Sequence, residues 1–570
     1  VGGGWRRAFT STIVRDNNPL FTKHLMPYNF AIGVKGGTNF IYHTLTNEIE
    51  HYVYRPKTKI KNNPPTRCLI SLDITNMFNE VSRQKAMEII DTHFQHLSPY
   101  TKLLLQDPTQ CWYLLPDGNW SFFKQNEGLP QGCPFSPVFA ALVLHTIIKP
   151  IDKKLRARAK ERKQNGNLGD DNKGGITNLL AYVDDLNCVI PIEDSLFFCQ
   201  EFQKLANSIG LKLNYKKSNI LTSITNTSII PYISDQNKET LQECLKHFTE
   251  GIETTKGTTI LGFPIGSKDY IQEKMANLTK KVDKGFEMIK ENLSNIQTIG
   301  QIFNTALIPK FYYTLCADVF QNATNCDSIF NYSSQHCHQI NTLFNKVLKF
   351  LTSENIIPTH VKELSERPTS QNGLHLLNPC KSAITASCAP ILKSIQIAKK
   401  GIPIQNKFIP LPSSIKSIYY NWSTQDTTIF KTLNKHLPEI VKTLHEKTSE
   451  PITPNIINDF TYNAPAHLIH EKIMHKIYEK NKGDIFKHIP PSSRHTIPSI
   501  INSRIPTILL KPCRQDKESR IPNEEFITAI RRSHRMPILP INSKLTCKCG
   551  KEIDQFGDHF FKCTHHSKTQ

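Results

Sequence analysis

Two adjacent aspartates, Asp184 and Asp185, lie between two short apolar runs, Leu179–Ala181 and Cys188–Ile190. Short apolar runs that flank a polar pair predict a β-hairpin with the carboxylates at its tip. Like charges held this close repel each other unless a cation neutralises them, and hard carboxylate oxygens favour magnesium. The alternative is a solvated turn, because Asp is also a common turn residue.

A third aspartate, Asp73, follows the apolar run Arg67–Leu72 upstream of the pair. At the end of a strand, it would complete a two-metal cage with the two hairpin carboxylates. Between these segments, residues 126–137 are rich in glycine and proline, which predicts a loop of unusual backbone geometry. A long apolar helix is expected from Pro137 onward. Together the three stretches favour a metal site over a solvated turn.

The patterns D-x4-F (from Asp73), G-x-P-Q-G-x3-S-P (from Gly128) and Y-V-D-D (from Tyr182) occur in this order. They resemble motifs A, B and C of reverse transcriptases, most of all those of non-LTR, LINE-like retrotransposons. The resemblance covers roughly residues 1–270. It implies an RNA-directed DNA polymerase with an α+β right-hand fold of fingers and palm, in which helices back a β-sheet. Asp73, Asp184 and Asp185 would hold two Mg²⁺ ions, with Mn²⁺ as an alternative.

The resemblance also implies roles for residues around the nucleotide. Phe78 matches the aromatic side chain that excludes the ribose 2′-hydroxyl; an ordinary core aromatic is the alternative. At Gln131, the side-chain amide can hydrogen-bond the sugar or the base edge. Gly132 would let the backbone approach the nucleotide closely.

Four further residues match the family at greater distance from the carboxylates. Lys217 falls in a segment that resembles motif D, where a lysine lies near the pyrophosphate leaving group as electrostatic support or general acid. Leu261 and Gly262 fall in a segment that resembles motif E, the primer grip. Arg7 is a candidate to hold triphosphate or template backbone, and solvated surface charge is an equal alternative.

The charge balance fits a polyanionic partner. Seventy basic and 49 acidic residues give the 570-residue chain a net charge of +21, and neutralising phosphates releases counterions and drives binding. The expected partners are an RNA template, a DNA primer or target, and dNTPs. Fifteen scattered cysteines favour reduced thiols, and we expect a nuclear enzyme with a cytoplasmic RNA–protein stage.

No membrane association is expected. The longest apolar stretch, Pro137 to Ile148, is too short to span a bilayer, and no signal peptide is visible. No pattern in the sequence predicts the oligomeric state.

Several local patterns make structural predictions. Ser82 is a candidate cap for a helix that carries Ala86, Ile89 and Ile90 on one face, and Asp194 for the helix behind the catalytic hairpin. The basic run Lys153–Lys163 predicts nucleic-acid contact or nuclear import. A solvated helix face explains that run equally well.

The domain organisation follows from position and composition. Residues 1–270 are expected to form the fingers and palm, with fingers truncated at the start, since the chain begins with Val inside a longer open reading frame. Residues 271–400 would form a helical thumb. Residues 401–540 are proline-rich and partly helical, and residues 541–570 would form a small zinc knuckle.

The C-terminal region carries a second constellation. Cys547, Cys549, His559 and Cys563 have the spacing C-x-C-x9-H-x3-C. Three sulfurs and one imidazole make the closed tetrahedral set of a structural zinc site; free cysteines are the alternative. The segment resembles the zinc knuckle of some non-LTR elements and is expected to contact nucleic acid without taking part in polymerisation.

Three other functions remain open. An intron-encoded maturase–reverse transcriptase and an RNA-dependent RNA polymerase are the nearest enzymes, and Phe78 argues against the latter because it would select dNTPs. An inactive polymerase relic that only binds nucleic acid is the non-enzymatic alternative. The three intact aspartates argue against it.

Overall fold

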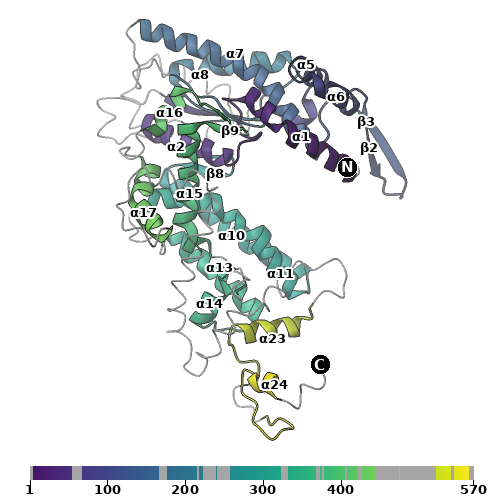
Figure 1. The fold of residues 1–570 in the computed structure, drawn as a ribbon, viewed down its shortest axis with the longest axis vertical. Coiled ribbons are helices and arrows are strands. Elements are labelled where there is room, and N and C mark those ends of the chain that lie inside the picture. The colour runs from purple at the N-terminus through teal and green to yellow at the C-terminus, as the bar shows by residue number, and fades with distance from the viewer. Residues whose placement is uncertain are drawn as a thin grey trace. The chain divides into compact units, whose positions relative to one another are not determined.

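The computed structural model describes residues 4–53, 67–165, 176–214, 217–221, 239, 257–322, 332–367, 373–374, 376, 378–404, 407–420, 427–444, 474, 521–540 and 545–563. These residues belong to two compact units (Figure 1). Unit 1 spans residues 1–267, 390–434 and 458–463, and unit 2 spans residues 268–389, 435–457 and 464–570.

Unit 1 is mixed α and β. Between residues 4 and 208 its helices are α1 (Gly4–Leu25), α2 (Gly37–Tyr52), α4 (Met77–Glu80), α5 (Arg83–His93), α6 (Ser98–Leu105), α7 (Ser136–Gln164) and α8 (Ile192–Ser208), with a 3₁₀ turn at Gln95–Leu97. Its strands are β1 (Arg67–Leu72), β2 (Thr109–Leu114), β3 (Trp120–Gln125), β4 (Leu180–Tyr182), β5 (Asp185–Pro191), β6 (Asn219–Leu221), β7 (Gly257–Ile260) and β8 (Phe263–Gly266).

A four-stranded sheet in the order β4-β5-β1-β6 organises this unit, and all its neighbouring strands are antiparallel. The central strands β1 and β5 are buried along nearly their whole length, as expected when both faces of a sheet are covered. Helix α8 packs on β1 and β5, with α7 behind it, and α2 also contacts both strands. Figure 1 shows α7 and α8 on one side of the sheet and α2 on the other.

The apolar core lies between the sheet and helices α5, α7 and α8. Alternate residues of β1 (Cys68, Ile70 and Leu72) face it, because side chains of a strand alternate between the two faces. Ser82 accepts a hydrogen bond from the Lys85 N–H and caps α5. The predicted cap and apolar face of this helix are therefore confirmed.

Residues 390–434 return to unit 1, which the sequence analysis did not anticipate. They hold the end of α15 (Pro379–Lys400), the strands β9 (Ile402–Ile404) and β10 (Lys407–Ile409), α16 (Ser413–Tyr420) and the start of α17 (Thr428–Leu444). The Tyr419 hydroxyl lies 2.9 Å from the Thr44 hydroxyl, and His43 Nδ1 lies 2.9 Å from the Ser394 hydroxyl. These contacts fix the segment against α2.

The hairpin of β2 and β3 has exposed aromatic side chains on both faces. Trp112 packs on Phe122 with ring centroids 4.8 Å apart, and both rings remain about half exposed. Single exposed apolar residues are ordinary, but a cluster of this kind is uncommon on a monomer surface.

Unit 2 is built mainly of helices among its described residues. These are α10 (Lys268–Asn292), α11 (Ile296–Ile302), α12 (Phe311–Asn322), α13 (Gln335–Thr352), α14 (Thr359–Ser365), the first half of α15, α23 (Asn523–Ser533) and α24 (Asp558–Lys562). A π-helical turn at Phe303–Leu307 and a 3₁₀ turn at Ile308–Lys310 join α11 to α12. Most of residues 401–540 beyond 444 lie outside the described residues, so the connector expected there stays a prediction.

Within the described part of the chain, no helix combines the length and apolarity needed to cross a membrane.

Candidate active site

Strand register brings the three predicted metal ligands to one edge of the sheet. Leu72, the last residue of β1, lies opposite Leu186 of β5. Asp73 directly follows Leu72, and Asp185 directly precedes Leu186, so the two aspartates lie at the same end of the paired strands. The sheet thus joins residues separated by more than a hundred positions in the sequence.

The carboxylate hairpin has the tight geometry that the sequence predicts. Tyr182 pairs with Asp185, which leaves a two-residue turn of Val183 and Asp184 between β4 and β5. Val183 has φ +57°, a left-handed conformation that costs a β-branched residue roughly 1–2 kcal/mol. Strained residues of this kind gather at functional sites, where the surrounding structure holds them.

The electrostatics of this edge favour a bound cation. Burial, together with the neighbouring negative charges of Asp184 and Asp73, raises the pKa of Asp185 to about 6. Burial and Asp73 also raise the pKa of Asp184. Carboxylates that repel one another in a partly buried site are stabilised by a divalent metal ion.

The segment that resembles motif D is tied directly to Asp73. The Asn214 N–H donates to the Asp73 carbonyl at 2.9 Å, and the Asp73 N–H donates to the buried Ser218 hydroxyl at 3.0 Å. Lys217 precedes that serine, is exposed, and lowers the pKa values of Asp184 and Asp185 through its charge. The structure therefore brings Lys217 together with the carboxylates.

Two backbone hydrogen bonds join the predicted motif A segment to the predicted motif B segment, and we call this contact the seam. The Leu129 N–H donates to the Phe78 carbonyl at 2.6 Å, and the Gly128 N–H donates to the Val81 carbonyl at 3.0 Å. Gly128 has φ +79°, and a Cβ atom there would lie 2.3 Å from the Asn79 carbonyl oxygen. Glycine is therefore required at this position by both conformation and space.

Replacing Gly128 with Ala is expected to destabilise the chain by more than about 2 kcal/mol, because the new methyl group meets backbone that cannot move aside. Gly118 is the matched control, since it has φ +85° but open space around its Cβ position. Gly118→Ala should cost only about 1 kcal/mol, from backbone strain alone. Thermal unfolding of both variants measures the difference, and equal losses would contradict the seam.

Arg83 supports this seam and was not identified from the sequence. Its guanidinium donates to the Gly128 carbonyl at 2.7 Å and to the Asp107 carbonyl at 3.0 Å, and its own N–H donates to Glu127. The side chain is buried, so its charge is used to hold the loop rather than a ligand. Nothing in the sequence around Arg83 distinguishes it from a surface arginine.

Gln131 and Gly132 lie just beyond the seam and are both exposed. Gly132 has φ +79°, and nothing lies within 4 Å of its Cβ position. The open space beside this backbone is what a nucleotide would need. Phe78 is half-buried and packs on the edge of the core, which leaves its predicted role and the core alternative both consistent with its position.

The predicted primer-grip residues form a second tight hairpin. Leu261 and Gly262, with φ +50° and +85°, make the two-residue turn between β7 and β8. Two successive left-handed residues are typical of hairpin turns that match the strand twist. Phe263 stacks on Tyr42 of α2 at 4.2 Å and anchors the hairpin to unit 1. Arg7 lies exposed on α1, and its role stays a prediction.

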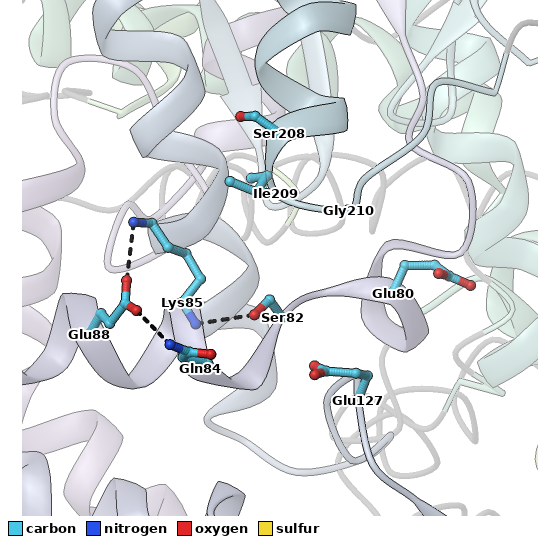
Figure 2. Close-up of a pocket in the computed structure, with 9 residues that line it drawn as sticks. All are labelled: Glu80, Ser82, Gln84, Lys85, Glu88, Glu127, Ser208, Ile209 and Gly210. Atoms are coloured by element: carbon cyan, nitrogen blue, oxygen red, sulfur yellow. Dashed lines mark hydrogen bonds and ion pairs between the residues drawn. The ribbon is translucent and has the colours of Figure 1, made fainter.

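A cavity of about 510 Å³ lies beyond α4, lined by Glu80, Ser82, Gln84, Lys85, Glu88, Glu127, Ser208, Ile209 and Gly210 (Figure 2). Glu88 is held by Lys85 and Gln84, and α8 ends beside the cavity at Ser208. Three glutamates and the negative end of a helix dipole repel a triphosphate. Ser82 and Lys85, at the positive N-terminal end of α5, also line the cavity, so its charge is mixed and it is not assigned to the nucleotide.

The basic run on α7 is partly structural. Arg158 and Arg162 reach the buried carboxylate of Asp194 on α8, at 2.6 Å and 2.8 Å. The prediction that Asp194 caps α8 is wrong, because the helix already begins at Ile192, with Pro191 in the capping position. A buried carboxylate needs a charged partner, and the two arginines supply it.

The four C-terminal zinc candidates come together in unit 2. One ligand atom from each of Cys547, Cys549, His559 and Cys563 lies within 4.8 Å of the others. Cys547 Sγ lies 3.7 Å from Cys563 Sγ, and Cys549 Sγ lies 3.1 Å from His559 Nε2. A hydrogen bond from the Lys551 N–H lowers the pKa of Cys549 to about 6, which favours the thiolate that binds metal.

The loops of this small module change direction at its two glycines. Gly550 and Gly557 both have positive φ, at +83° and +68°. The guanidinium of Arg535 lies 4.0 Å above the Phe556 ring and binds Asp558 at 2.7 Å. The module is therefore attached to the segment that follows α23, and the arrangement could hold a metal ion.

Comparison with known families finds a match over somewhat less than half of the chain. Residues 2–265 match the family described as reverse transcriptase (RNA-dependent DNA polymerase). These residues are therefore similar to a reverse transcriptase domain. No curated protein matches the chain.

The chain is also similar to solved telomerase structures. Apo telomerase from Candida tropicalis is 11% identical, with 68% of this chain and 56% of that chain covered and a TM-score of 0.29. Telomerase from Candida albicans in complex with a TWJ fragment of telomeric RNA is 11% identical, with 73% and 58% covered and a TM-score of 0.28. The chain spans about half the length of these structures.

Proposed function

We propose that the whole chain acts as the RNA-directed DNA polymerase of a non-LTR retrotransposon and copies RNA into DNA by nucleotidyl transfer. The observation that carries this proposal is the register of β1 against β5, which brings Asp73 to the same end of the sheet as Asp185, with Lys217 within electrostatic reach. The order of the three motifs and the Cys/His module support the retroelement type. The expected substrates are an RNA template, a DNA primer or target, and dNTPs.

The carboxylate edge fits Mg²⁺. Asp73, Asp184 and Asp185 would hold the ions, because burial and the negative charges around them raise the pKa values of Asp184 and Asp185, and a bound cation would relieve both effects. When bound, such ions lower the pKa of the primer 3′-hydroxyl and neutralise the triphosphate. Mn²⁺ accepts the same oxygen ligands and is the expected substitute.

The remaining residues act on the reactants directly. The Lys217 ammonium would stabilise the charge that develops on the leaving pyrophosphate, or donate a proton to it. Gln131 would orient the incoming nucleotide through its amide, beside the open backbone of Gly132. Leu261 and Gly262 would seat the primer 3′ end at their rigid turn.

The C-terminal module fits a structural zinc ion. Three thiols and one imidazole gathered within 4.8 Å match the ligand number and softness that Zn²⁺ prefers. We propose that the module contacts nucleic acid through exposed groups such as Lys548 and Lys551. A nuclear location, preceded by a cytoplasmic RNA–protein stage, follows from the proposed copying of RNA at a DNA target.

Primer extension with the purified chain tests this proposal against its alternatives. A polymerase should extend a DNA primer on an RNA template in Mg²⁺, whereas an inactive relic binds the duplex and extends nothing. Extension of a free DNA 3′ end that is not annealed to the RNA would support the retrotransposon type over a maturase. Incorporation of NTPs at the same efficiency as dNTPs would instead indicate an RNA polymerase.

Phe78→Val is expected to relax selection against NTPs on the order of ten- to a hundredfold, because it opens space at the sugar 2′ position. The measurement is the ratio of kcat/KM for dNTP and NTP. Phe198→Val is the control, since Phe198 is fully buried on α8 in the same core. Phe198→Val should lower the free energy of unfolding by as much as Phe78→Val or more, and it should not change the selection of dNTPs over NTPs. If both variants keep wild-type selection, Phe78 is only a core residue.

A further inference from the structure

Helix α7 extends well beyond the part that packs in the core, and its second half is strongly basic. Between positions 149 and 163 it carries eight basic and two acidic residues: Lys149, Lys153, Lys154, Arg156, Arg158, Lys160, Arg162 and Lys163 against Asp152 and Glu161. A basic run can be structural, or it can be a surface for a polyanion. The ion pairs along the helix show which basic side chains are structural and which are available to a polyanion.

Four of the eight basic side chains are used within the protein. Lys154 pairs with Glu201 at 2.5 Å, and Arg156 pairs with Asp152 at 2.6 Å. Arg158 and Arg162 pair with Asp194. The contacts of Lys154, Arg158 and Arg162 fix α7 against α8. The Arg156–Asp152 pair lies within α7 itself, beside the remaining lysines.

The other four, Lys149, Lys153, Lys160 and Lys163, form what we call the lysine face. At 100° per residue they fall within an arc of about 80°, and at 1.5 Å per residue they extend over roughly 21 Å. All four are exposed. Within the described part of the chain none of them forms an ion pair, and Arg158 and Arg162 lie on roughly the opposite side of the helix.

Local structure does not account for this face. Lysines in the last turn of a helix stabilise its dipole, which explains Lys163 and partly Lys160. Lys149 and Lys153 lie in the middle of the helix, where that effect has faded. Their acidic neighbour, Asp152, is buried and paired with Arg156. The aligned lysines therefore concentrate positive charge that repels itself, and the folded chain alone gains nothing from it.

We propose that the lysine face binds the sugar–phosphate backbone of the single-stranded RNA template. One strand of a duplex presents a phosphate about every 3.4 Å of helix axis, and an extended single strand presents them less densely, so 21 Å of helix can face at most roughly six phosphates. Lysine is a compact charge that reads no sequence, as a surface for a template of any sequence requires. This inference rests on the proposed RNA template.

A single strand fits this surface better than a duplex. An α-helix is a straight convex rod, and a duplex is another, so the two touch over a short length only. A flexible single strand can follow the helix and meet all four lysines. Because the face begins about 20 Å along α7 from Ser136, it would hold template away from the residues that hold the nucleotide.

The test is RNA binding by the full chain carrying Lys153→Gln, Lys160→Gln and Lys163→Gln together. The control is Lys85→Gln, Lys102→Gln and Lys154→Gln, which removes the same charge from lysines already ion-paired. Binding is measured by fluorescence anisotropy with two probes. One is a short blunt RNA–DNA duplex; the other has the same duplex and an RNA overhang of roughly 30 nucleotides, long enough to reach a face about 20 Å away.

The lysine-face variant should bind the overhang probe about tenfold or more weakly, and its slope of log K against log salt should fall by about 2, from three phosphate contacts on a single strand. Binding of the blunt duplex should stay unchanged, and so should primer extension on a template overhang of only a few nucleotides, which is too short to reach the lysine face. These two results separate this inference from the polymerase assignment. Equal losses in the control, no loss at all, or a larger loss with a DNA overhang than with an RNA overhang would overturn it.

Discussion

Asp184→Asn is expected to reduce primer extension at least a thousandfold while the protein stays folded and binds primer–template duplex. Asp184 lies at the tip of the β4–β5 hairpin, next to Asp185 and within electrostatic reach of Asp73. Asparagine keeps the shape of the side chain and removes the charge that would bind the metal ion. Loss of a charged group that acts directly on the reacting atoms costs several orders of magnitude in rate.

The same substitution should not destabilise the fold. Burial raises the pKa of Asp184 above its usual value, and that of Asp185 to about 6. A carboxyl with a raised folded-state pKa binds its proton more tightly in the folded chain, so its contribution is full at low pH and is lost as pH rises toward 6. At pH 7 without divalent ions, the Asp185 carboxylate therefore costs stability, on the order of 1–3 kcal/mol.

Thermal unfolding and extension together check this prediction. Mg²⁺ should raise the unfolding temperature of the wild type and have little effect on Asp184→Asn or Asp185→Asn. Asp117→Asn is the control, because Asp117 lies exposed at the β2–β3 turn and should keep full activity. Undiminished extension by Asp184→Asn would end the metal assignment, and unfolding of that variant would show that Asp184 is structural.

The catalytic edge could be predicted from sequence because each part has a strong local signal. The apolar runs around Asp184 and Asp185 specify a hairpin, and the apolar run before Asp73 specifies a strand. Strand β1 has the predicted range, and β4 and β5 overlap the predicted runs but are shifted or longer. What sequence spacing could not give is the register that brings Asp73 to the same end of the sheet as Asp185, since register depends on pairing between distant strands.

The features that the sequence did not predict depend on contacts between parts of the chain that are distant in sequence. Arg83 resembles a surface arginine until the loop at Gly128 folds onto it. Asp194 follows the pattern of a helix cap, but it forms ion pairs with Arg158 and Arg162 of another helix. The packing of residues 390–434 on α2 depends on contacts such as Tyr419 with Thr44, and no local period or motif encodes such a contact.

Cys549→Ser in the full chain is expected to abolish stoichiometric zinc binding while primer extension on a short duplex persists. Cys549 would supply one of three thiol ligands, and its sulfur lies 3.1 Å from His559 Nε2. Serine is a poor ligand for zinc, so the closed four-ligand set is lost. Because so short a segment cannot bury a core, the metal should supply much of its folding free energy.

Metal content and cobalt spectroscopy measure the effect. The wild type should bind one equivalent of Zn²⁺ at this site, and Co²⁺ should give the visible and charge-transfer bands of three thiolates and one imidazole. Cys549→Ser should lose those bands and become sensitive to proteolysis around residues 545–563. Cys111→Ser is the control, since Cys111 lies on the β2 strand of unit 1 and should leave metal content unchanged.

The attachment of the module to unit 2 allows a second variant that keeps all four ligands. Arg535 binds Asp558 at 2.7 Å and covers the Phe556 ring. Arg535→Gln should loosen this attachment and still bind zinc, because it removes no ligand. Normal cobalt bands in Cys549→Ser would disprove the site, and loss of primer extension in both variants would show that the module takes part in polymerisation rather than standing apart from it.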